Sequence, residues 1–230
     1  GEPPEADACL LPMDPGTVGG ARSAVPLRHQ APRAPDALID RIETRYAARD
    51  LPVHLRIADA ACFDGLAAAL AGRGYASGKP TLTQVGSLRA MREAGSSGEV
   101  AEVVTAPDAG WTGVFLGPGF DPVDGACRVE ALTRARGNLF ASVRENGVTV
   151  AAGAVSLGHG WAGVHGMRTE QSARGRGLAG RVLAGLAQAA LDRGFERVFL
   201  QVEAGNEPAL ALYRRAGFRQ AWAYSYWHIP

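Results

Sequence analysis

One stretch decides the fold: Arg174-Gly175-Arg176-Gly177-Leu178-Ala179-Gly180, because an expected strand ends shortly before it and an expected helix begins within it. Glycines let backbone N–H groups approach a ligand closely and point into one concavity. The helix N-terminus adds a partial positive charge, and the side chains of Arg174 and Arg176 add full charges beside it. The turn therefore suits a pyrophosphate, which predicts a cofactor that carries a nucleotide.

The residues around this turn follow strand and helix patterns in alternation. Before the turn, antiparallel strands are expected, two of them joined by the hairpin signal Asn146-Gly147. After it, an apolar stripe predicts a helix that ends at Gly194, then a strand, a second helix and an aromatic strand. The pattern predicts an α/β fold. The expected strands are 99–104, 140–144, 148–156, 162–169, 198–203 and 221–227, and the expected helices are 178–193 and 207–215.

The N-terminal half repeats this rhythm. Matching Arg73-Gly74-Tyr75 to Ala216-Gly217-Phe218 places Leu70 opposite Tyr213, an offset of 143 residues (213 − 70). This spacing favours an ancient duplication, although two unrelated strand–helix–strand segments can also be matched in this way. The first copy has no glycine-rich turn, so we expect it to be a scaffold or a lid. Its expected strands are 24–27, 53–57 and 82–85, and its expected helices are 35–49 and 63–71.

Domain boundaries follow from composition. Residues 1–20 are rich in proline, glycine and acidic residues, which predicts a poorly ordered lead-in. A glycine- and serine-rich linker around Gly95-Ser96-Ser97-Gly98 separates the two halves. We therefore expect a degenerate domain over 21–94 and a catalytic domain over 99–230.

Charge and cysteine content narrow the function classes. The 230 residues carry 24 basic and 23 acidic side chains, a net charge of +1, so nucleic acid and anionic membranes are not expected partners. No apolar run approaches the ~20 residues of a membrane span, and the start does not resemble a signal peptide. Cys9, Cys62 and Cys127 are odd in number and lack C-x-x-C spacing, which predicts neither a disulfide framework nor a metal site. A cytoplasmic protein is expected.

The glycine-rich turn also matches the dinucleotide fingerprint, through Gly175-x-Gly177-x-x-Gly180 and an acidic residue, Glu203, at the end of the next strand. In a dinucleotide fold the first glycine follows its strand almost at once, whereas here five residues separate Thr169 from Gly175. Only 27 residues (230 − 203) follow Glu203, too few for further βαβ units. A dinucleotide-dependent oxidoreductase is therefore kept only as an alternative.

Two motifs resemble those of a known family, the GCN5-related N-acetyltransferases (GNAT). The family's acetyl-CoA motif, Gln or Arg followed by x-x-Gly-x-Gly/Ala, is met by Arg174, Gly177 and Ala179. Its second motif, an Asn after a strand and then a helix with a Tyr before Gly-Phe, is met by Asn206 and Tyr213. The resemblance covers about residues 99–230. The duplicated arrangement is similar to tandem members in which only the C-terminal copy is active.

The resemblance implies a GNAT acyl-CoA N-acyltransferase fold with an N-terminal GNAT-like half-domain, and acetyl-CoA as cosubstrate without a metal. It implies a mixed sheet that splays between the strand ending at Thr169 and the strand 198–203. The pantetheine arm would lie in that gap and bond to the backbone of Met167, Arg168 and Thr169. Asn206 would hold the arm from the other side. The pyrophosphate would bind the amides of Arg174, Gly175, Arg176, Gly177, Leu178, Ala179 and Gly180.

The reaction needs an acid and a base. A phenol can protonate the departing thiolate, and Tyr213 matches that general acid, although it could also be a packed helical aromatic. Glu203 and His165 are candidate bases, each with a structural alternative, and a backbone carbonyl with water could also serve. In family members that acetylate the N-termini of ribosomal proteins, the resemblance places a catalytic base, a Glu, at the position of Gln201. This chain departs from that pattern, so ribosomal-protein N-termini are not favoured as its substrates. The resemblance suggests the N–H of Met167 as an oxyanion donor.

Two groups of aromatic residues are candidates for the acceptor pocket, although ordinary core packing is the favoured explanation for them. They are Trp222, Tyr224 and Tyr226 on the last strand, and Trp111, Phe115 and Phe120 in the segment where family members build the acceptor wall. Nearby carboxylates could attract a cationic amine or could cap helices; they are Asp121, Asp124 and Glu130.

We therefore expect an N-acetyltransferase acting by direct attack in a ternary complex on a primary amine of a small molecule or peptide, as a monomer or homodimer. The alternatives are a non-catalytic acetyl-CoA binding module and the oxidoreductase.

Overall fold

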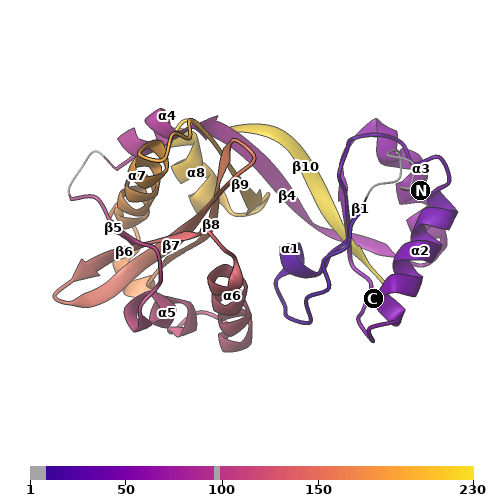
Figure 1. Ribbon diagram of the computed structural model, residues 1–230, viewed down its shortest axis with the longest axis horizontal. Helices are drawn as coiled ribbons and strands as arrows, with labels where there is room; N and C mark the ends of the chain where they lie inside the picture. The colour runs from indigo at the N-terminus through magenta and orange to yellow at the C-terminus, as the bar shows by residue number, and fades with distance from the viewer. Residues whose placement is uncertain (1–8, 96–98) are drawn as a thin grey trace. The chain divides into compact units, whose positions relative to one another are not determined.

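The computed structural model describes residues 9–95 and 99–230, which form two compact units (Figure 1). Unit 1 comprises the described residues up to Leu82 together with Trp222–Pro230, and unit 2 comprises Thr83–Ala221. Strands β4 (Ala76–Ser87) and β10 (Arg219–His228) each contribute residues to both units. The units thus divide at Leu82 and Ala221, whereas the expected linker includes Ser96–Gly98, which lie outside the described residues.

Unit 1 packs two helices around a core of aliphatic and aromatic side chains. Helices α2 (Pro35–Ala47) and α3 (Asp64–Gly72) pack together, and the strand order is β3-β10-β4 with β3 (Leu55–Ala58) antiparallel to β10. The fully enclosed side chains of this core are Ile39, Ile42, Tyr46, Leu55, Phe63, Leu66 and Leu70. The two positions matched to Asn206 and Tyr213 in the second half, Phe63 and Leu70, are thus core positions.

Part of the segment expected to be a lead-in belongs to unit 1. Strand β1 (Cys9–Leu10) pairs antiparallel with β2 (Val25–Pro26), and Leu11 and Met13 pack against the core. The short helix α1 (Gly19–Arg22) and the 3₁₀ turn η2 (Ala61–Phe63) complete the unit. Residues 1–8 of the expected lead-in lie outside the described residues.

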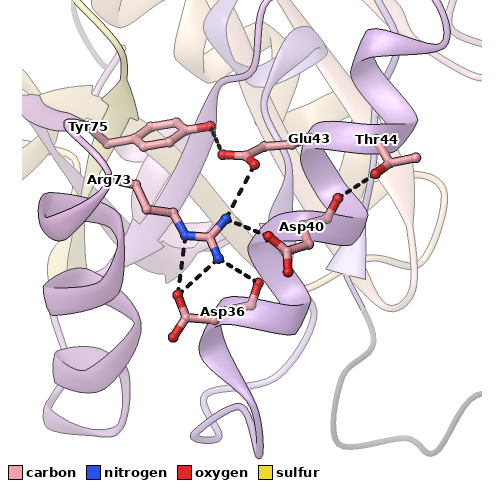
Figure 2. A network of polar contacts seen from close by, with 6 residues as sticks. All are labelled: Asp36, Asp40, Glu43, Thr44, Arg73 and Tyr75. Atoms are coloured by element: carbon pink, nitrogen blue, oxygen red, sulfur yellow. Dashed lines mark hydrogen bonds and ion pairs between the residues drawn. The ribbon is translucent and has the colours of Figure 1, made fainter.

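A single arginine joins the end of α3 to α2, as Figure 2 shows. The guanidinium of Arg73 donates to Asp36 at 2.9 Å, to Asp40 at 2.6 Å and to Glu43 at 3.3 Å, and these hydrogen bonds raise its pKa. The hydroxyl of Tyr75 donates to Glu43 at 3.0 Å, and burial followed by this carboxylate raises the pKa of Tyr75. The three carboxylates fall on one face of α2 because they are spaced four and three residues apart.

The surroundings of His54 predict that the stability of the protein depends on pH. Its ring stacks on that of His228 with 5.7 Å between centroids, and burial, then Arg22, then His228 lower the pKa of His54 from 6.5 to about 4. The unfolded chain therefore binds more protons between these values, so stability is complete above pH 6.5 and is lost as the pH falls towards 4. The full pKa shift would correspond to a change of about 3 kcal/mol in the free energy of unfolding. Solvent screening of this partly exposed ring reduces the expected change to about 1 kcal/mol.

The measurement is urea denaturation at pH 7 and pH 4.5. On acidification, the free energy of unfolding is expected to fall by about 1 kcal/mol less in His54→Gln than in the unsubstituted protein. The reason is that the neutral amide does not take up a proton. His159→Gln, at an exposed turn, is the matched control. An equal loss in His54→Gln and the unsubstituted protein contradicts the prediction.

Unit 2 is built on a mixed sheet with the order β4-β9-β8-β7-β6-β5. The strands from β5 to β8 are antiparallel neighbours, and β8 and β9 are parallel. The expected hairpin is confirmed, because Asn146 and Gly147 both have positive φ, 52° and 80°, as a two-residue turn requires. The strands are β5 (Glu102–Val104), β6 (Leu139–Glu145), β7 (Val148–Gly158), β8 (Trp161–Thr169) and β9 (Arg197–Glu203).

Helices cover both faces of this sheet. Helix α7 (Leu178–Leu191) packs on β6 and β7 and against α4 (Leu88–Glu93), while α5 (Ala109–Leu116) packs on β7 and against α6 (Pro122–Arg134). A Cβ on Gly153 of β7 would meet Val182 of α7, whereas its neighbours Ala152 and Ala154 pack against Trp111 of α5. Because adjacent strand residues point to opposite faces, α7 and α5 lie on opposite sides of β7.

The sequence did not predict α4, α5 or α6. Helix α5 carries Gly110 and Gly113, which have low helix propensity. The start of helix α6 has a recognisable sequence signal, because Asp121 caps it by accepting from the amides of Val123 and Asp124, and Pro122 occupies the first turn.

Strand β4 is far longer than the expected strand 82–85. The Lys79-Pro80 pair within it obscures the strand pattern.

The crossing of α5 and α6 depends on Gly125. A Cβ there would lie 2.2 Å from the backbone oxygen of Phe115, closer than any stable contact. Gly125→Ala is expected to lower the free energy of unfolding by about 1–3 kcal/mol, because the helices must move apart. Gly113→Ala is the matched control, since nothing lies within 4 Å of a Cβ there and alanine favours a helix. Urea denaturation of both variants tests the prediction, and equal stabilities would contradict it.

Candidate active site

The expected splay of the sheet is visible in the strand register. β8 and β9 pair in parallel from Trp161 and Arg197 up to Val164 and Leu200. Beyond these pairs β8 continues to Thr169 and β9 to Glu203 with no further pairing between them. The end of β8 that contains Met167, Arg168 and Thr169 therefore has backbone groups that face a gap rather than a strand.

A β-bulge redirects β8 at the start of this gap. His165 pairs with Ala154 and Arg168 with Ala152, so Gly166 and Met167 oppose the single residue Gly153. Gly166 has φ of 60°, which favours glycine, and a Cβ there would lie 2.7 Å from Leu132. The sequence reasoning missed this bulge, although a lone glycine inside a strand is its usual signal.

The glycine-rich turn has the open backbone that its sequence predicts. Gly175 and Gly177 have φ of 75° and 77°, and nothing lies within 4 Å of a Cβ at either position. Gly177 is the N-cap of α7, and its carbonyl accepts from the amides of Gly180 and Arg181. Among the described residues no acceptor is found for the amides of residues 175–179. The turn thus offers unpaired donors at the N-terminus of a fourteen-residue helix.

The arginine side chains of the turn are already engaged. Arg176 forms an ion pair with Glu145 at 2.7 Å, and Arg174 donates from Nε to the carbonyl of Thr169 at 3.3 Å. The guanidinium of Arg174 also lies over the ring of Phe120, 5.7 Å from its centroid. Arg174 therefore links the end of β8 to the turn, and its terminal nitrogens remain available for an anion.

Helix α8 (Glu207–Arg215) carries the two other motif residues. Asn206 caps the helix, because its Oδ1 accepts from the amide of Ala209 at 3.2 Å, so only its Nδ2 is left to donate to a ligand. Tyr213 is 7% exposed, and its ring packs edge to face against Phe218 at 5.8 Å. Burial raises the pKa of Tyr213 to about 12, so the phenol is protonated at neutral pH.

The two candidate bases lie on β8 and β9 in different settings. The Nε2 of His165 lies 3.0 Å from the hydroxyl of Ser156, a partner that the sequence did not indicate, and burial lowers the pKa of His165. The imidazole is therefore neutral at pH 7 and able to accept a proton. Glu203 is an exposed carboxylate at the end of β9, on the same face as the exposed Gln201 and opposite the buried Val202.

The aromatic residues of the expected acceptor pocket fall into two groups. Trp111 and Phe115 are fully enclosed core residues, so packing explains them. Phe120 lines a cavity of about 400 Å³, and the guanidinium of Arg168 lies 4.0 Å from its ring centroid. The remaining residues of the cavity wall are Val114, Gly117, Pro118, Glu170, Gln171 and Ser172. Trp222, Tyr224 and Tyr226 belong to unit 1, where β10 pairs with β3.

The three carboxylates near that segment all have structural roles. Asp121 caps α6, Asp124 pairs with Arg128 at 2.6 Å and with Arg168 at 3.4 Å, and Glu130 lies 3.7 Å from Arg134 on the helix surface. Their contacts therefore do not support the expectation that these carboxylates attract a cationic amine.

A protein-family profile described as "Probable histone acetyltransferase Rv0428c C-terminal" matches residues 5–227, nearly the whole chain. The chain belongs to this acetyltransferase family. It is thereby a member of the GNAT family, as the two motifs predict.

Curated relatives match a short part of the chain. It is 45% identical over 62 residues to a mycothiol acetyltransferase of Clavibacter sepedonicus, which covers 27% of this chain and 20% of the relative. It is 43% identical over 54 residues to the mycothiol acetyltransferase of Corynebacterium aurimucosum, which covers 24% of this chain and 18% of the relative. The chain thus spans about a fifth of the length of the curated relatives that it matches.

Solved structures share the fold at low sequence identity. A GCN5-related N-acetyltransferase from Kribbella flavida superposes with a TM-score of 0.68 at 18% identity, over 91% of this chain and 82% of the other. A tandem GNAT protein from the clavulanic acid biosynthesis pathway superposes with a TM-score of 0.60 at 16% identity, over 84% of this chain and 68% of the other. These likenesses confirm the expected GNAT fold.

GNAT membership implies acetyl-CoA as the cosubstrate, and the residues present fit it. The unpaired amides of residues 175–179 suit its pyrophosphate, and the open space in front of Gly175 and Gly177 leaves room for it. Over the described ranges 9–95 and 99–230, no three His, Cys, Asp or Glu side chains are grouped to hold a metal ion. Within the same ranges, no helix combines the length and apolar character that a membrane span requires.

Proposed function

We propose that the chain is an acetyl-CoA-dependent N-acetyltransferase that acts on a primary amine by direct attack in a ternary complex. The observation that carries the proposal is the unpaired amides of residues 175–179, which occur in the same unit as the protonated phenol of Tyr213 and the end of β8 that no strand covers. These features fit the three parts of acetyl-CoA: an anion site for its phosphates, an unpaired strand end for its pantetheine arm, and an acid for the sulfur of its thioester.

The binding roles follow from backbone groups that β9 does not pair, although the carbonyl of Thr169 already accepts from Nε of Arg174. The amides of residues 175–179 and the terminal nitrogens of Arg174 would hold the pyrophosphate, since a helix N-terminus and guanidinium groups favour phosphate oxygens. The backbone of Met167, Arg168 and Thr169 would pair with the amides of the pantetheine arm, much as a further strand would. The Nδ2 of Asn206 would donate to the same arm, while its Oδ1 continues to cap α8.

The chemical roles follow from protonation states. The neutral imidazole of His165 would accept the proton that the ammonium group of the acceptor must lose before its nitrogen attacks, with the hydroxyl of Ser156 fixing the ring. Glu203, exposed at the end of β9, is the second candidate base. The phenol of Tyr213 would give its proton to the sulfur as the carbon–sulfur bond breaks, which leaves free CoA and an amide.

The division of labour between the two halves is part of the proposal. The core positions Phe63 and Leu70 take the places that correspond to Asn206 and Tyr213, so the first copy lacks both a ligand-binding amide and an acid. We propose that the N-terminal copy is non-catalytic and that unit 2 carries the transfer.

The test has two measurements on the full chain. Calorimetric titration with acetyl-CoA, CoA and NAD is expected to give micromolar binding of the first two only. A thiol reagent then follows CoA release from acetyl-CoA over a panel of small amines and lysine-containing peptides. Acetyl-CoA binding without amine-dependent release over this panel would favour a non-catalytic binding module, and a preference for NAD would overturn the proposal.

A further inference from the structure

The bulge in β8 turns Arg168 towards α5 and α6. Arg168 pairs with Ala152, which packs in the cluster around Trp111, whereas the sulfur of Met167 would lie 2.6 Å from a Cβ on Gly153, on the α7 side. The side chain of Arg168 therefore lies on the face of the sheet opposite α7. The resemblance to the GNAT family implies that the backbone of Arg168 bonds to the pantetheine arm. It implies no function for the side chain.

The guanidinium of Arg168 is held in place but has few hydrogen-bond partners. It stacks 4.0 Å from the ring centroid of Phe120 and 5.7 Å from that of Phe115, and its side chain is 16% exposed. Its side chain makes one long hydrogen bond, from Nη2 to the carboxylate of Asp124 at 3.4 Å. A guanidinium has five N–H donors, so most of its hydrogen-bonding capacity is left for a ligand.

Charges of both signs lie around Phe120, since Asp121 follows it in the chain and Glu170 lines the same cavity. Asp124 is shared between Arg168 and Arg128, and the closer contact, 2.6 Å, is to Arg128. Arg174 adds a third guanidinium within 5.7 Å of the same ring. Burial, followed by repulsion from Arg128, lowers the pKa of Arg168, while Asp124 acts in the opposite direction. A bound anion would favour the charged guanidinium in the same way as Asp124 does.

Phe120, the ring on which the guanidinium of Arg168 stacks, also lines a cavity of about 400 Å³. Glu170 lines the same cavity, so a ligand that fits it would carry a positive group as well as a negative one. A primary amine that also bears an oxyanion has this composition.

We propose that Arg168 binds an oxyanion of the acceptor, so that the acceptor is a primary amine that also carries a carboxylate or a phosphate. The proposal rests on the acetyl transfer proposed above and names the class of its substrate. Because the stacked ring fixes the plane of the guanidinium, a carboxylate or phosphate would meet two parallel N–H donors.

Matched pairs of amines test the proposal. O-Phosphoethanolamine is compared with ethanolamine, and glycine with glycinamide, so that the phosphate and carboxylate sources are distinguished. Each is titrated calorimetrically into the CoA complex of the full chain, and CoA release from acetyl-CoA is followed in parallel. At least one charged member is expected to bind about 10-fold or more tightly than its neutral partner, the difference that hydrogen bonds to a charged group supply.

Variants locate the preference. Arg168→Gln is expected to abolish the preference while leaving the Kd for acetyl-CoA within about twofold, and Arg168→Lys to retain part of it. Arg134→Gln, on the exposed surface of α6, is the matched control and is expected to change neither quantity.

Three results would overturn the proposal. One is equal affinity within both pairs, which includes the case in which no member binds. Another is a charge preference that survives Arg168→Gln. The third is weaker acetyl-CoA binding in Arg168→Gln with the preference unchanged, which would assign Arg168 to the phosphates of the cosubstrate. The proposed function fails by a separate route, through absent acetyl-CoA binding by the unsubstituted protein.

Discussion

Tyr213→Phe is expected to lower kcat for amine acetylation at pH 7 by about 10²–10⁴-fold, the usual contribution of a positioned general acid. The variant keeps the ring that packs against Phe218, so folding and acetyl-CoA affinity should be preserved. Because burial raises the pKa of Tyr213 to about 12, the acid remains protonated throughout the accessible range, and kcat should show no descending limb from this group below about pH 11. Steady-state kinetics across pH, with calorimetric Kd values for acetyl-CoA, provide the measurement.

Tyr75→Phe is the matched control for this variant. It also removes the hydroxyl of a buried tyrosine, one that donates to Glu43 in unit 1 rather than to a reacting group. Its kcat should stay within about twofold of the unsubstituted protein, since no proton transfer depends on it. A kcat for Tyr213→Phe that matches that of Tyr75→Phe would mean that Tyr213 is a packing residue, the alternative that its position in a helix leaves open.

Gly177→Trp should weaken acetyl-CoA binding by about 100-fold or more. The indole would occupy the open space in front of the turn and block the amides of residues 175–179, and losing two hydrogen bonds to a charged group is enough for this effect. Tryptophan at φ of 77° also costs about 1–2 kcal/mol in backbone strain. Calorimetric titration of acetyl-CoA measures the change in Kd, and thermal unfolding measures the strain.

Gly147→Trp separates these two effects. Gly147 has φ of 80° and open space around a Cβ, like Gly177, but it lies in the hairpin between β6 and β7. Both variants should lose similar stability, and only Gly177→Trp should lose affinity. If both bind acetyl-CoA as the unsubstituted protein does, the turn is not the phosphate site.

The parts of the fold that the sequence predicted well have strong local signals. Helix α7 combines an apolar stripe with a glycine-rich start, and the hairpin at Asn146-Gly147 has residues that tolerate positive φ. Helix α5 and the long strand β4 were missed because glycines and the Lys79-Pro80 pair weaken their patterns, and tertiary packing overrides those local preferences.

The candidate site shows the same contrast. The positions of Gly175, Gly177 and Tyr213 could be read from motifs because their spacing along the chain is fixed. The contacts of Arg168 with Phe120 and of Ser156 with His165 could not, since each joins residues of different elements whose proximity depends on packing and register. The chemical roles assigned to Glu203, His165 and Asn206 stay predictions.

The shared strands have a practical consequence for protein engineering. A cut in the linker after residue 94, which the sequence suggests as a domain border, would remove α4 from its packing against α7 and would remove β4 from the edge of β9. It would also strip unit 1 of the strand segment Trp222–Pro230 that pairs with β3. Neither half is therefore a transplantable module, and co-expression of residues 1–94 and 99–230 as separate chains should restore activity where either alone does not.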